Sequence, residues 1–341
     1  MKKYLIAILL SLATLTCAYA SSDRDWNVDV LGNGFEQSTL QLADDYEGSV
    51  VATLVRKLNP ELSTKAVLYI HGYVDYFFQE EMAQRFIDAG YNFYALDLRK
   101  YGRSLREHQR PNMMKDVAEY EEEITKAIEI IRNEEGNTKL LLSAHSTGGL
   151  IAITYADKFK EDKPFDAIFL NSPFFDLNDS LIQVNQTFIS NLAEAYGARF
   201  PYSESSMGLS DLYGKSVHQY YFGEWDFNLN WKPVEGFPLY AGWTAAVIRA
   251  QKNLQEGIDV GVPVLVMYSK GSIKKSTWDE GYLSNDGVLD VEDIDRISDV
   301  IGDHVTEIRI QGGMHDLVLS KEPVRKNVYD KLFTWLSAYI K

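Results

Sequence analysis

The stretch LLLSAHSTGGLIAI, residues 140–153, decides how the rest of the chain is interpreted. Three leucines lead into a short run of small and polar residues, and a second apolar segment follows at once. This pattern predicts a buried strand that turns into a helix within about four residues. Ala144 and Gly148 flank Ser146 at two residues' distance, where small side chains let the strand and the helix approach each other. Such a strained turn, a nucleophile elbow, pushes the serine hydroxyl outward.

An ordinary tight turn with Ser146 as a helix-capping residue is the alternative interpretation of this stretch. The elbow pattern usually has glycine where Ala144 stands, and alanine adds only a methyl group. We also expect the helix that follows to direct free N–H groups at the serine, which would favour negative charge developing beside it.

The first twenty residues have the pattern of a secretory signal peptide. Lys2 and Lys3 precede an apolar run that extends to about Leu15, and residues 18–20 (Ala-Tyr-Ala) offer small side chains at the two positions that determine cleavage. We therefore expect cleavage after Ala20 and export to the periplasm or the medium. The apolar run is short for a bilayer span, so a retained membrane anchor is the weaker interpretation and no stable membrane insertion is expected.

Cys17 is the only cysteine of the chain, and it lies inside this leader segment. A lipid-modified Cys17 at the mature N-terminus is an alternative, although Thr14 and Thr16 are poor flanking residues for it. After cleavage behind Ala20 the chain would contain no cysteine, so we expect no disulfide, thiol catalyst or zinc-thiolate site.

The composition of the 341-residue chain is that of a globular enzyme, with 45% hydrophobic and 24% charged residues. The formal net charge is −15, and the loss of Lys2 and Lys3 with the leader makes it −17 (−15 − 2). Such a negative charge repels phosphate backbones and anionic lipid surfaces, so we expect no nucleic-acid partner. The composition gives no indication of an oligomeric state.

Strand-like and helix-like segments alternate along most of the chain. Strands are expected at 49–55, 66–70, 91–98, 140–145, 165–171, 262–269 and 305–310, and helices at 77–89, 116–133, 147–159, 291–301 and from 323 onward. This alternation predicts an α/β fold with a mostly parallel central sheet flanked by helices, whose ligands bind beyond the carboxyl ends of the strands.

The alternation stops in residues 173–245, where aromatic side chains are frequent and the pattern is irregular. We interpret this segment as a cap inserted over the active-site face of a core that consists of residues 21–172 and 246–341. The alternative is that these aromatic residues form the core of a second domain. Both interpretations predict an apolar inner wall.

A serine hydroxyl becomes a strong nucleophile only when a base takes its proton and an acid orients that base. His315 is the predicted base because it follows the last expected strand on a Gly-Gly turn. Asp286 is the predicted acid, because an apolar pair and then a helix follow it, although the long loop 270–285 precedes it. Asp290 is the alternative acid, and Asp316 is expected to point away from the base.

The oxyanion hole needs backbone N–H donors beside the nucleophile. The predicted donors are Thr147, which follows the nucleophile, and Tyr73, which follows the pair His71-Gly72. We expect His71 to brace its loop and His145 to support the elbow.

We predict neither a metal nor a cofactor. The remaining histidines show no metal-ligand spacing; they are His108, His218 and His304. Gly32 and Gly34 form a lone Gly-x-Gly without the strand-to-helix context of a dinucleotide site.

Taken together, these motifs resemble the α/β-hydrolase family, most closely its branch of monoacylglycerol lipases, lysophospholipase-like enzymes and serine aminopeptidase-like enzymes. The resemblance spans residues 66–173 and 262–336 and rests on four motifs: His71-Gly72, Asp97-Leu98 with Gly102-Arg103-Ser104, residues 144–149, and Gly312-Gly313-Met314-His315. It implies an α/β-hydrolase fold with a Ser-Asp-His triad. Ala144 and the long loop before Asp286 depart from the family pattern, and the loop puts the acid assignment in question.

The expected function is that of an exported serine hydrolase that cleaves carboxylic esters through an acyl-enzyme, with a small ester or lipid-like molecule as substrate. The resemblance implies the class, and the aromatic cap favours an apolar acyl group. A serine aminopeptidase is one alternative, for which Glu224 and Asp226 are candidate ligands of a substrate ammonium group. A non-catalytic binding protein with this fold is the other.

Overall fold

The computed structural model describes residues 24–177, 186–205 and 210–341. The expected signal peptide, residues 1–20, lies outside this range. In the described part of the chain, no helix is long and apolar enough to cross a membrane.

The described strands form one large central sheet in the order β1-β2-β3-β5-β4-β6-β7-β10-β11. Their bounds are β1 (Asn27–Val28), β2 (Glu36–Gln41), β3 (Val51–Lys57), β4 (Lys65–Ile70), β5 (Asn92–Asp97), β6 (Lys139–His145), β7 (Ala167–Asn171), β10 (Val264–Ser269) and β11 (Val305–Ile310). The pairs from β5 to β11 are parallel, whereas β1, β2 and β3 pair in antiparallel fashion with their neighbours. The mostly parallel sheet is thus confirmed, with an antiparallel edge.

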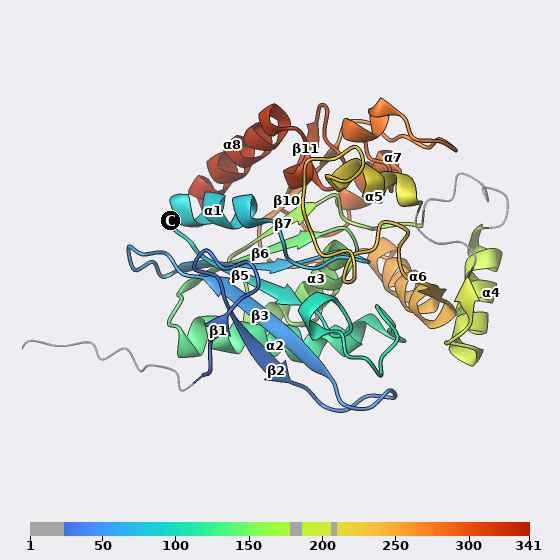
Figure 1. The fold of residues 1–341 in the computed structure, drawn as a ribbon, viewed down its shortest axis with the longest axis horizontal. Helices are drawn as coiled ribbons and strands as arrows, with labels where there is room; N and C mark the ends of the chain where they lie inside the picture. The colour runs from blue at the N-terminus through green and yellow to red at the C-terminus, as the bar shows by residue number, and fades with distance from the viewer. Residues whose placement is uncertain (1–23, 178–185, 206–209) are drawn as a thin grey trace, which may run out of the picture.

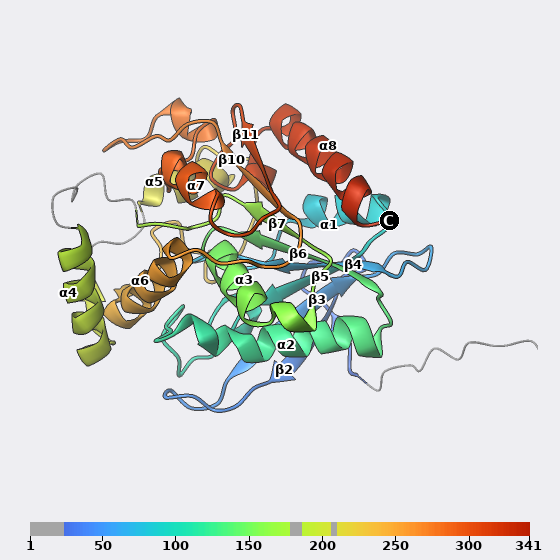
Figure 2. The same ribbon diagram turned by 180° about the vertical axis from the view of Figure 1, so that it is seen from behind.

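Helices cover both faces of this sheet (Figure 1 and Figure 2). On one face lie α1 (Glu80–Asp88) and α8 (Glu322–Tyr339), and on the other lie α2 (Glu121–Glu129), α3 (Thr147–Lys158) and α7 (Val291–Ser298). The strands alternate between the two cores as a pleated strand must: Leu68 packs with the α2 and α3 side, and its neighbour Tyr69 packs with the α1 and α8 side.

Two expected helices are shorter in the structure: the one expected at 291–301 ends at Ser298, and the one expected at 77–89 begins late. The segment expected at 116–133 is helical throughout, as a 3-10 turn η2 (Val117–Tyr120), the helix α2 and a wider turn η3 (Ile130–Glu134), and Asp116 caps its first turn in a capping box with Glu119. The helix expected from residue 77 begins only at Glu80, since the Phe77 N–H donates to the Asp97 carboxylate (2.9 Å) instead of entering a helix.

The cap segment contains regular elements of its own, and its expected end falls inside a helix. The elements are α4 (Gln186–Arg199), β8 (Glu204–Ser205), α5 (Asp211–Val217), β9 (Leu239–Tyr240) and α6 (Ala241–Gln255). A Cβ on Gly197 of α4 would lie 2.1 Å from the Ala241 carbonyl oxygen, so the glycine lets α4 and α6 pack closely. Because α6 extends from Ala241 to Gln255, the expected boundary between residues 245 and 246 does not coincide with the end of an element.

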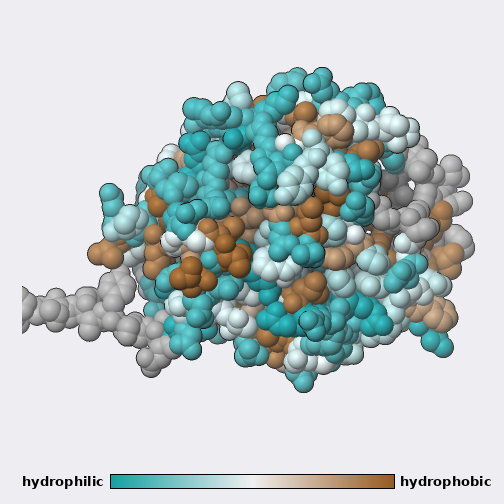
Figure 3. All heavy atoms as spheres, viewed as in Figure 1, coloured by the Kyte–Doolittle hydropathy of each residue, from teal (hydrophilic) through white to brown (hydrophobic). Residues whose placement is uncertain are grey.

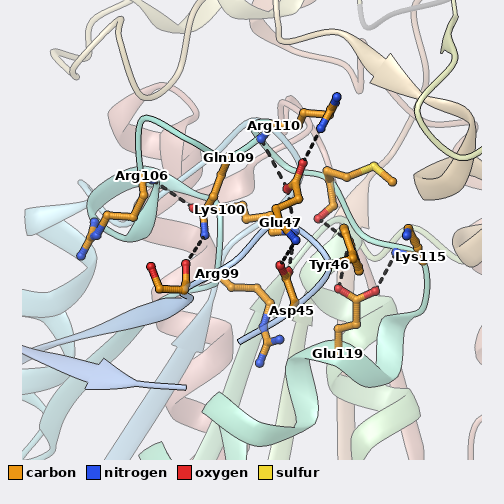
Figure 4. Close-up of polar contacts among 12 residues, drawn as sticks. Asp45, Tyr46, Glu47, Arg99, Lys100, Arg106, Gln109, Arg110, Lys115 and Glu119 are labelled. Atoms are coloured by element: carbon orange, nitrogen blue, oxygen red, sulfur yellow. Dashed lines mark hydrogen bonds and ion pairs between the residues drawn. The ribbon is translucent and has the colours of Figure 1, made fainter. Parts of the chain in front are cut away.

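Buried ion pairs fix the loop that follows β5. The Lys100 ammonium lies 2.6 Å from the Asp45 carboxylate and 2.9 Å from the Glu47 carboxylate, and 4.1 Å from the centre of the Tyr46 ring (Figure 4). The Arg103 guanidinium forms buried ion pairs with Asp29 (2.7 Å) and Asp97 (2.9 Å). The Lys100 contacts hold the loop between β2 and β3 in place. The Arg103 contacts join the motif Gly102-Arg103-Ser104 to β5 and to the residue after β1, so this motif has a structural role.

Candidate active site

Ser146 lies at the sharp turn between β6 and α3, with φ 54° and ψ −122°. A positive φ is uncommon for serine and persists only where the surroundings hold it. A Cβ on Gly148 would lie 2.3 Å from the His71 carbonyl oxygen, so only glycine fits there. Ala144, the departure from the usual elbow pattern, is fully buried in the main core, where its methyl group is accommodated.

The structure brings Ser146, His315 and Asp286 into one hydrogen-bonded chain. The His315 Nε2 lies 3.0 Å from the Ser146 hydroxyl oxygen, and Nδ1 lies 2.8 Å from the Asp286 carboxylate. Because an ionised carboxylate can only accept, Nδ1 carries the proton and the lone pair of Nε2 faces the serine hydroxyl. This is the arrangement in which a histidine can remove the serine proton.

Asp286 reaches this position although the long loop 270–285 separates it from β10. The loop returns to the strand end, where the Asp286 N–H donates to the Gly271 carbonyl (2.9 Å) and the Asp286 carbonyl accepts from Ile273 (2.7 Å). The second carboxylate oxygen of Asp286 accepts from the backbone N–H groups of Val288 (2.8 Å) and Leu289 (2.7 Å). The inserted loop therefore leaves the acid beside the end of β10.

The other two carboxylates weighed from the sequence have different partners. Asp290 caps α7, where its side chain accepts from the Glu292 N–H (3.1 Å). Asp316 accepts from the side-chain amide of Asn171 (2.6 Å), and its backbone N–H donates to the Tyr213 hydroxyl (3.1 Å). The structure thus places Asp286, rather than Asp290 or Asp316, on the histidine.

The two expected oxyanion-hole donors flank the nucleophile. Thr147 is the first residue of α3, and an N–H group in the first turn of a helix has no partner within that helix. Tyr73 follows Gly72, and a Cβ on Gly72 would lie 3.0 Å from the Ser146 Cβ. A side chain at position 72 would therefore crowd the serine, and Gly72 lets the chain before Tyr73 lie close beside it.

Two buried histidines hold the loops around Ser146. His71 accepts from the Leu98 N–H at Nε2 (3.1 Å), so its Nδ1 carries a proton and donates to the Gly72 carbonyl (2.8 Å). His145 Nδ1 lies 3.1 Å from the Asn171 carbonyl oxygen. Burial lowers the pKa of both side chains, which are neutral near pH 7. Both contacts agree with the expected bracing roles.

A family model described as serine aminopeptidase, S33 (Hydrolase_4) matches residues 62–271, more than half of the chain. The chain belongs to this α/β-hydrolase family. The expected family branch and the α/β-hydrolase fold with its mostly parallel sheet are thereby confirmed, and the cap over the site stays an interpretation of residues 173–245. A monoacylglycerol lipase of Mycolicibacterium smegmatis is 30% identical over 129 residues, which cover 37% of this chain and 44% of that protein.

Solved structures of the same fold cover almost the whole chain. A soluble variant of monoglyceride lipase from Saccharomyces cerevisiae superposes with a TM-score of 0.63 at 15% identity, over 89% of this chain and 96% of its own. The monoacylglycerol lipase of Paleococcus ferrophilus superposes with a TM-score of 0.60 at 18% identity, over 89% of this chain and 99% of its own. A carboxyl esterase of Bacillus coagulans superposes with a TM-score of 0.63 at 13% identity, over 89% of this chain and 99% of its own. At these identities the similarity establishes the fold alone.

The aminopeptidase-like alternative within this family had Glu224 and Asp226 as its candidate ammonium ligands. Both side chains face solvent, with exposed fractions of 59% and 72%. Glu224 lies 3.4 Å from the Arg325 guanidinium, and Asp226 lies 3.9 Å from the His218 ring. The structure does not bring either carboxylate to the Ser146–His315–Asp286 chain. In the described residues, no group of three or more His, Cys, Asp and Glu side chains could hold a metal ion.

Sequence reasoning missed the cap residues that contact this α/β-hydrolase site. Tyr213 of α5 packs edge-on against the His315 ring, with 5.4 Å between ring centres. Lys232 forms a buried ion pair with Asp75, two residues after Tyr73. The aromatic content of the cap was the only signal for Tyr213, and no periodicity relates Lys232 to a loop so far away in the sequence.

Proposed function

We propose that this α/β-hydrolase of the monoacylglycerol lipase and esterase type is an exported serine hydrolase that cleaves carboxylic esters with apolar acyl groups. The hydrogen-bonded chain from Ser146 through His315 to Asp286, at the carboxyl ends of parallel strands, carries this proposal. The sequence pattern of residues 1–20 supports export.

Each group has a defined role in the reaction. The Ser146 oxygen attacks the ester carbonyl carbon while His315 Nε2 takes the serine proton, and the Asp286 carboxylate stabilises the imidazolium that forms. The carbonyl oxygen becomes negative and accepts from the N–H groups of Tyr73 and Thr147. His315 then gives its proton to the departing alkoxide, which leaves as an alcohol. Water, deprotonated by the same nitrogen, releases the acid from the acyl-enzyme and restores the serine hydroxyl.

Aromatic side chains beside the nucleophile support an apolar acyl group. The Phe174 N–H donates to the Ser146 carbonyl (3.0 Å), so Phe174 lies directly next to the elbow. Its ring stacks on Trp243, with 6.5 Å between ring centres, and Trp243 contacts Tyr73 at 4.4 Å. These three rings connect the cap to both loops that flank Ser146, and apolar walls of this kind are typical of sites for hydrophobic ligands.

The cap segment also carries exposed apolar side chains. On α4 the exposed ones recur at helical spacing; they are Ile189, Leu192 and Tyr196, and the exposed Phe200 follows directly after the helix. Figure 3 shows separate apolar patches among the hydrophilic residues of this view. Exposed apolar groups are common singly, but a row of them on one helix favours contact with apolar molecules. We take this as further support for lipid-like substrates.

A panel of p-nitrophenyl esters and aminoacyl anilides tests the substrate class. Each additional CH₂ buried in an apolar pocket contributes about 0.8 kcal/mol, which corresponds to about fourfold in kcat/KM. We therefore expect kcat/KM to rise from the acetate toward medium-chain esters until the pocket is full. Anilides with a free α-ammonium group should be poor substrates, because Glu224 and Asp226 face solvent. Faster turnover of the anilides than of every ester would favour the serine aminopeptidase-like alternative instead.

A further inference from the structure

The loop after β4, residues 71–78, carries the Tyr73 donor. Its backbone conformation depends on contacts with other parts of the molecule. Val74, the next residue, is buried with φ 49°. For a β-branched residue such a backbone angle is a genuine outlier, which persists only where surrounding contacts impose it. The direction of the Tyr73 N–H therefore depends on what holds the residues on either side of Val74.

On the amino-terminal side the holding group is His71, whose ring accepts from Leu98. On the carboxyl-terminal side it is a segment of the cap, residues 225–232, which packs along residues 75–78. The Asn228 N–H donates to the Tyr76 hydroxyl (2.8 Å), and the Phe227 ring lies 5.0 Å from the Phe78 ring. This cap segment is thus packed against the loop 71–78.

The innermost contact of this segment is an ion pair between Lys232 and Asp75. The ammonium nitrogen lies 2.6 Å from the Asp75 carboxylate, and the two residues are 9% and 2% exposed. The same nitrogen lies 5.5 Å from the Phe78 ring centre and 5.7 Å from that of Phe227. Burial by itself would raise the pKa of Asp75, but the neighbouring positive charge, chiefly that of Lys232, outweighs burial and lowers it.

A buried ion pair is a weak source of stability, because removing two charges from water costs about as much as their attraction returns. It does impose one geometry, since both groups must meet to avoid an unpaired buried charge. Asp75 follows Val74 directly, so this geometry is imposed on the strained end of the Tyr73 loop.

We propose that Lys232 is a positioning residue that orients the Tyr73 oxyanion-hole donor through its buried ion pair with Asp75. The inference rests on the proposed ester hydrolysis and deepens it. It makes the cap segment 225–232 a fixed part of the catalytic geometry, whereas the nucleophile, the base and the acid all come from the core.

Comparing an ester with its thionoester measures the alignment of the oxyanion hole. A purely structural role of Lys232 would not change this comparison. Sulfur in place of the carbonyl oxygen is a poor hydrogen-bond acceptor, so a well-aligned oxyanion hole favours the oxygen ester over its thiono analogue. The ratio of kcat/KM for a p-nitrophenyl ester to that for the matching thionoester is measured for wild type, Lys232→Met and the double variant Lys232→Met/Asp75→Asn. Lys215→Met is the matched control, because it breaks a more exposed ion pair of the cap, with Asp211.

We expect Lys232→Met to lower this ratio by about tenfold or more, mainly through kcat of the oxygen ester, with KM changed less than about twofold. The double variant removes the unpaired charge, so its thermal midpoint should exceed that of the single variant while its ratio stays low. If the single variant does not fold, the ratio of the double variant decides. Lys215→Met should keep the wild-type ratio.

A wild-type ratio in both Lys232 variants, or recovery of the ratio in the double variant, would overturn the positioning role. A wild-type enzyme that hydrolyses neither ester would instead refute the proposed function itself, so the two failures are distinguishable.

Discussion

Replacing Ser146 with alanine is expected to lower kcat for ester hydrolysis on the order of 10⁶-fold, while the protein stays folded. The reason is that the Ser146 hydroxyl is the group that lies 3.0 Å from His315 Nε2, and without it no acyl-enzyme can form. The change removes a single oxygen atom, so it creates no steric conflict at the turn. Initial rates with the best p-nitrophenyl ester, together with the thermal midpoint, measure both parts of this expectation.

Ser143→Ala is the matched control, because Ser143 is a buried serine on the same strand, β6. It should keep most of the activity. If both variants lost activity to the same extent, a general disturbance of β6 would explain the loss and the role of Ser146 would remain without support.

Replacing Asp286 with asparagine is expected to lower kcat about 10⁴-fold, while the geometry of the site changes little because the two side chains have nearly the same size. The carboxylate holds the His315 proton on Nδ1, across 2.8 Å. An amide nitrogen in its place would donate to Nδ1 and favour the tautomer protonated at Nε2, which cannot accept the serine proton. The pre-steady-state rate of acylation measures this effect most directly.

Asp290→Asn is the control for this variant. Asparagine caps helices as well as aspartate does, so the cap of α7 should survive and activity should change little. A large loss in Asp290→Asn with a small one in Asp286→Asn would contradict the geometry of the loop 270–285.

The parts of the site that follow from local sequence patterns were predictable. The elbow, the His71-Gly72 turn and the Gly-Gly turn before His315 each follow the end of an expected strand, and parallel strands bring their carboxyl ends to one edge. Asp286 was ambiguous, because the choice between it and Asp290 depends on where the loop 270–285 rejoins the sheet. A backbone bridge between Ser272 and Asp286 decides that point, and no residue pattern indicates it.

The cap shows the limit of sequence reasoning for this fold. Its aromatic content indicated an apolar wall, but the contact of Lys232 with Asp75 joins residues 157 positions apart and follows no periodicity. The contact of Tyr213 with His315 likewise follows no periodicity of the sequence. Local propensity also placed the start of the helix at 77–89 too early, because the Phe77 N–H donates to the Asp97 carboxylate and the helix begins at Glu80.

Covalent labelling with a fluorophosphonate tests the central claim most directly, because the reagent reacts with an activated serine hydroxyl and needs no knowledge of the natural substrate. Intact mass spectrometry of the wild-type protein should show a single addition, and peptide mapping should locate it on Ser146. Ser146→Ala protein should remain unlabelled under the same conditions. Labelling that persists in the alanine variant, or a wild-type protein that does not react, would contradict the account.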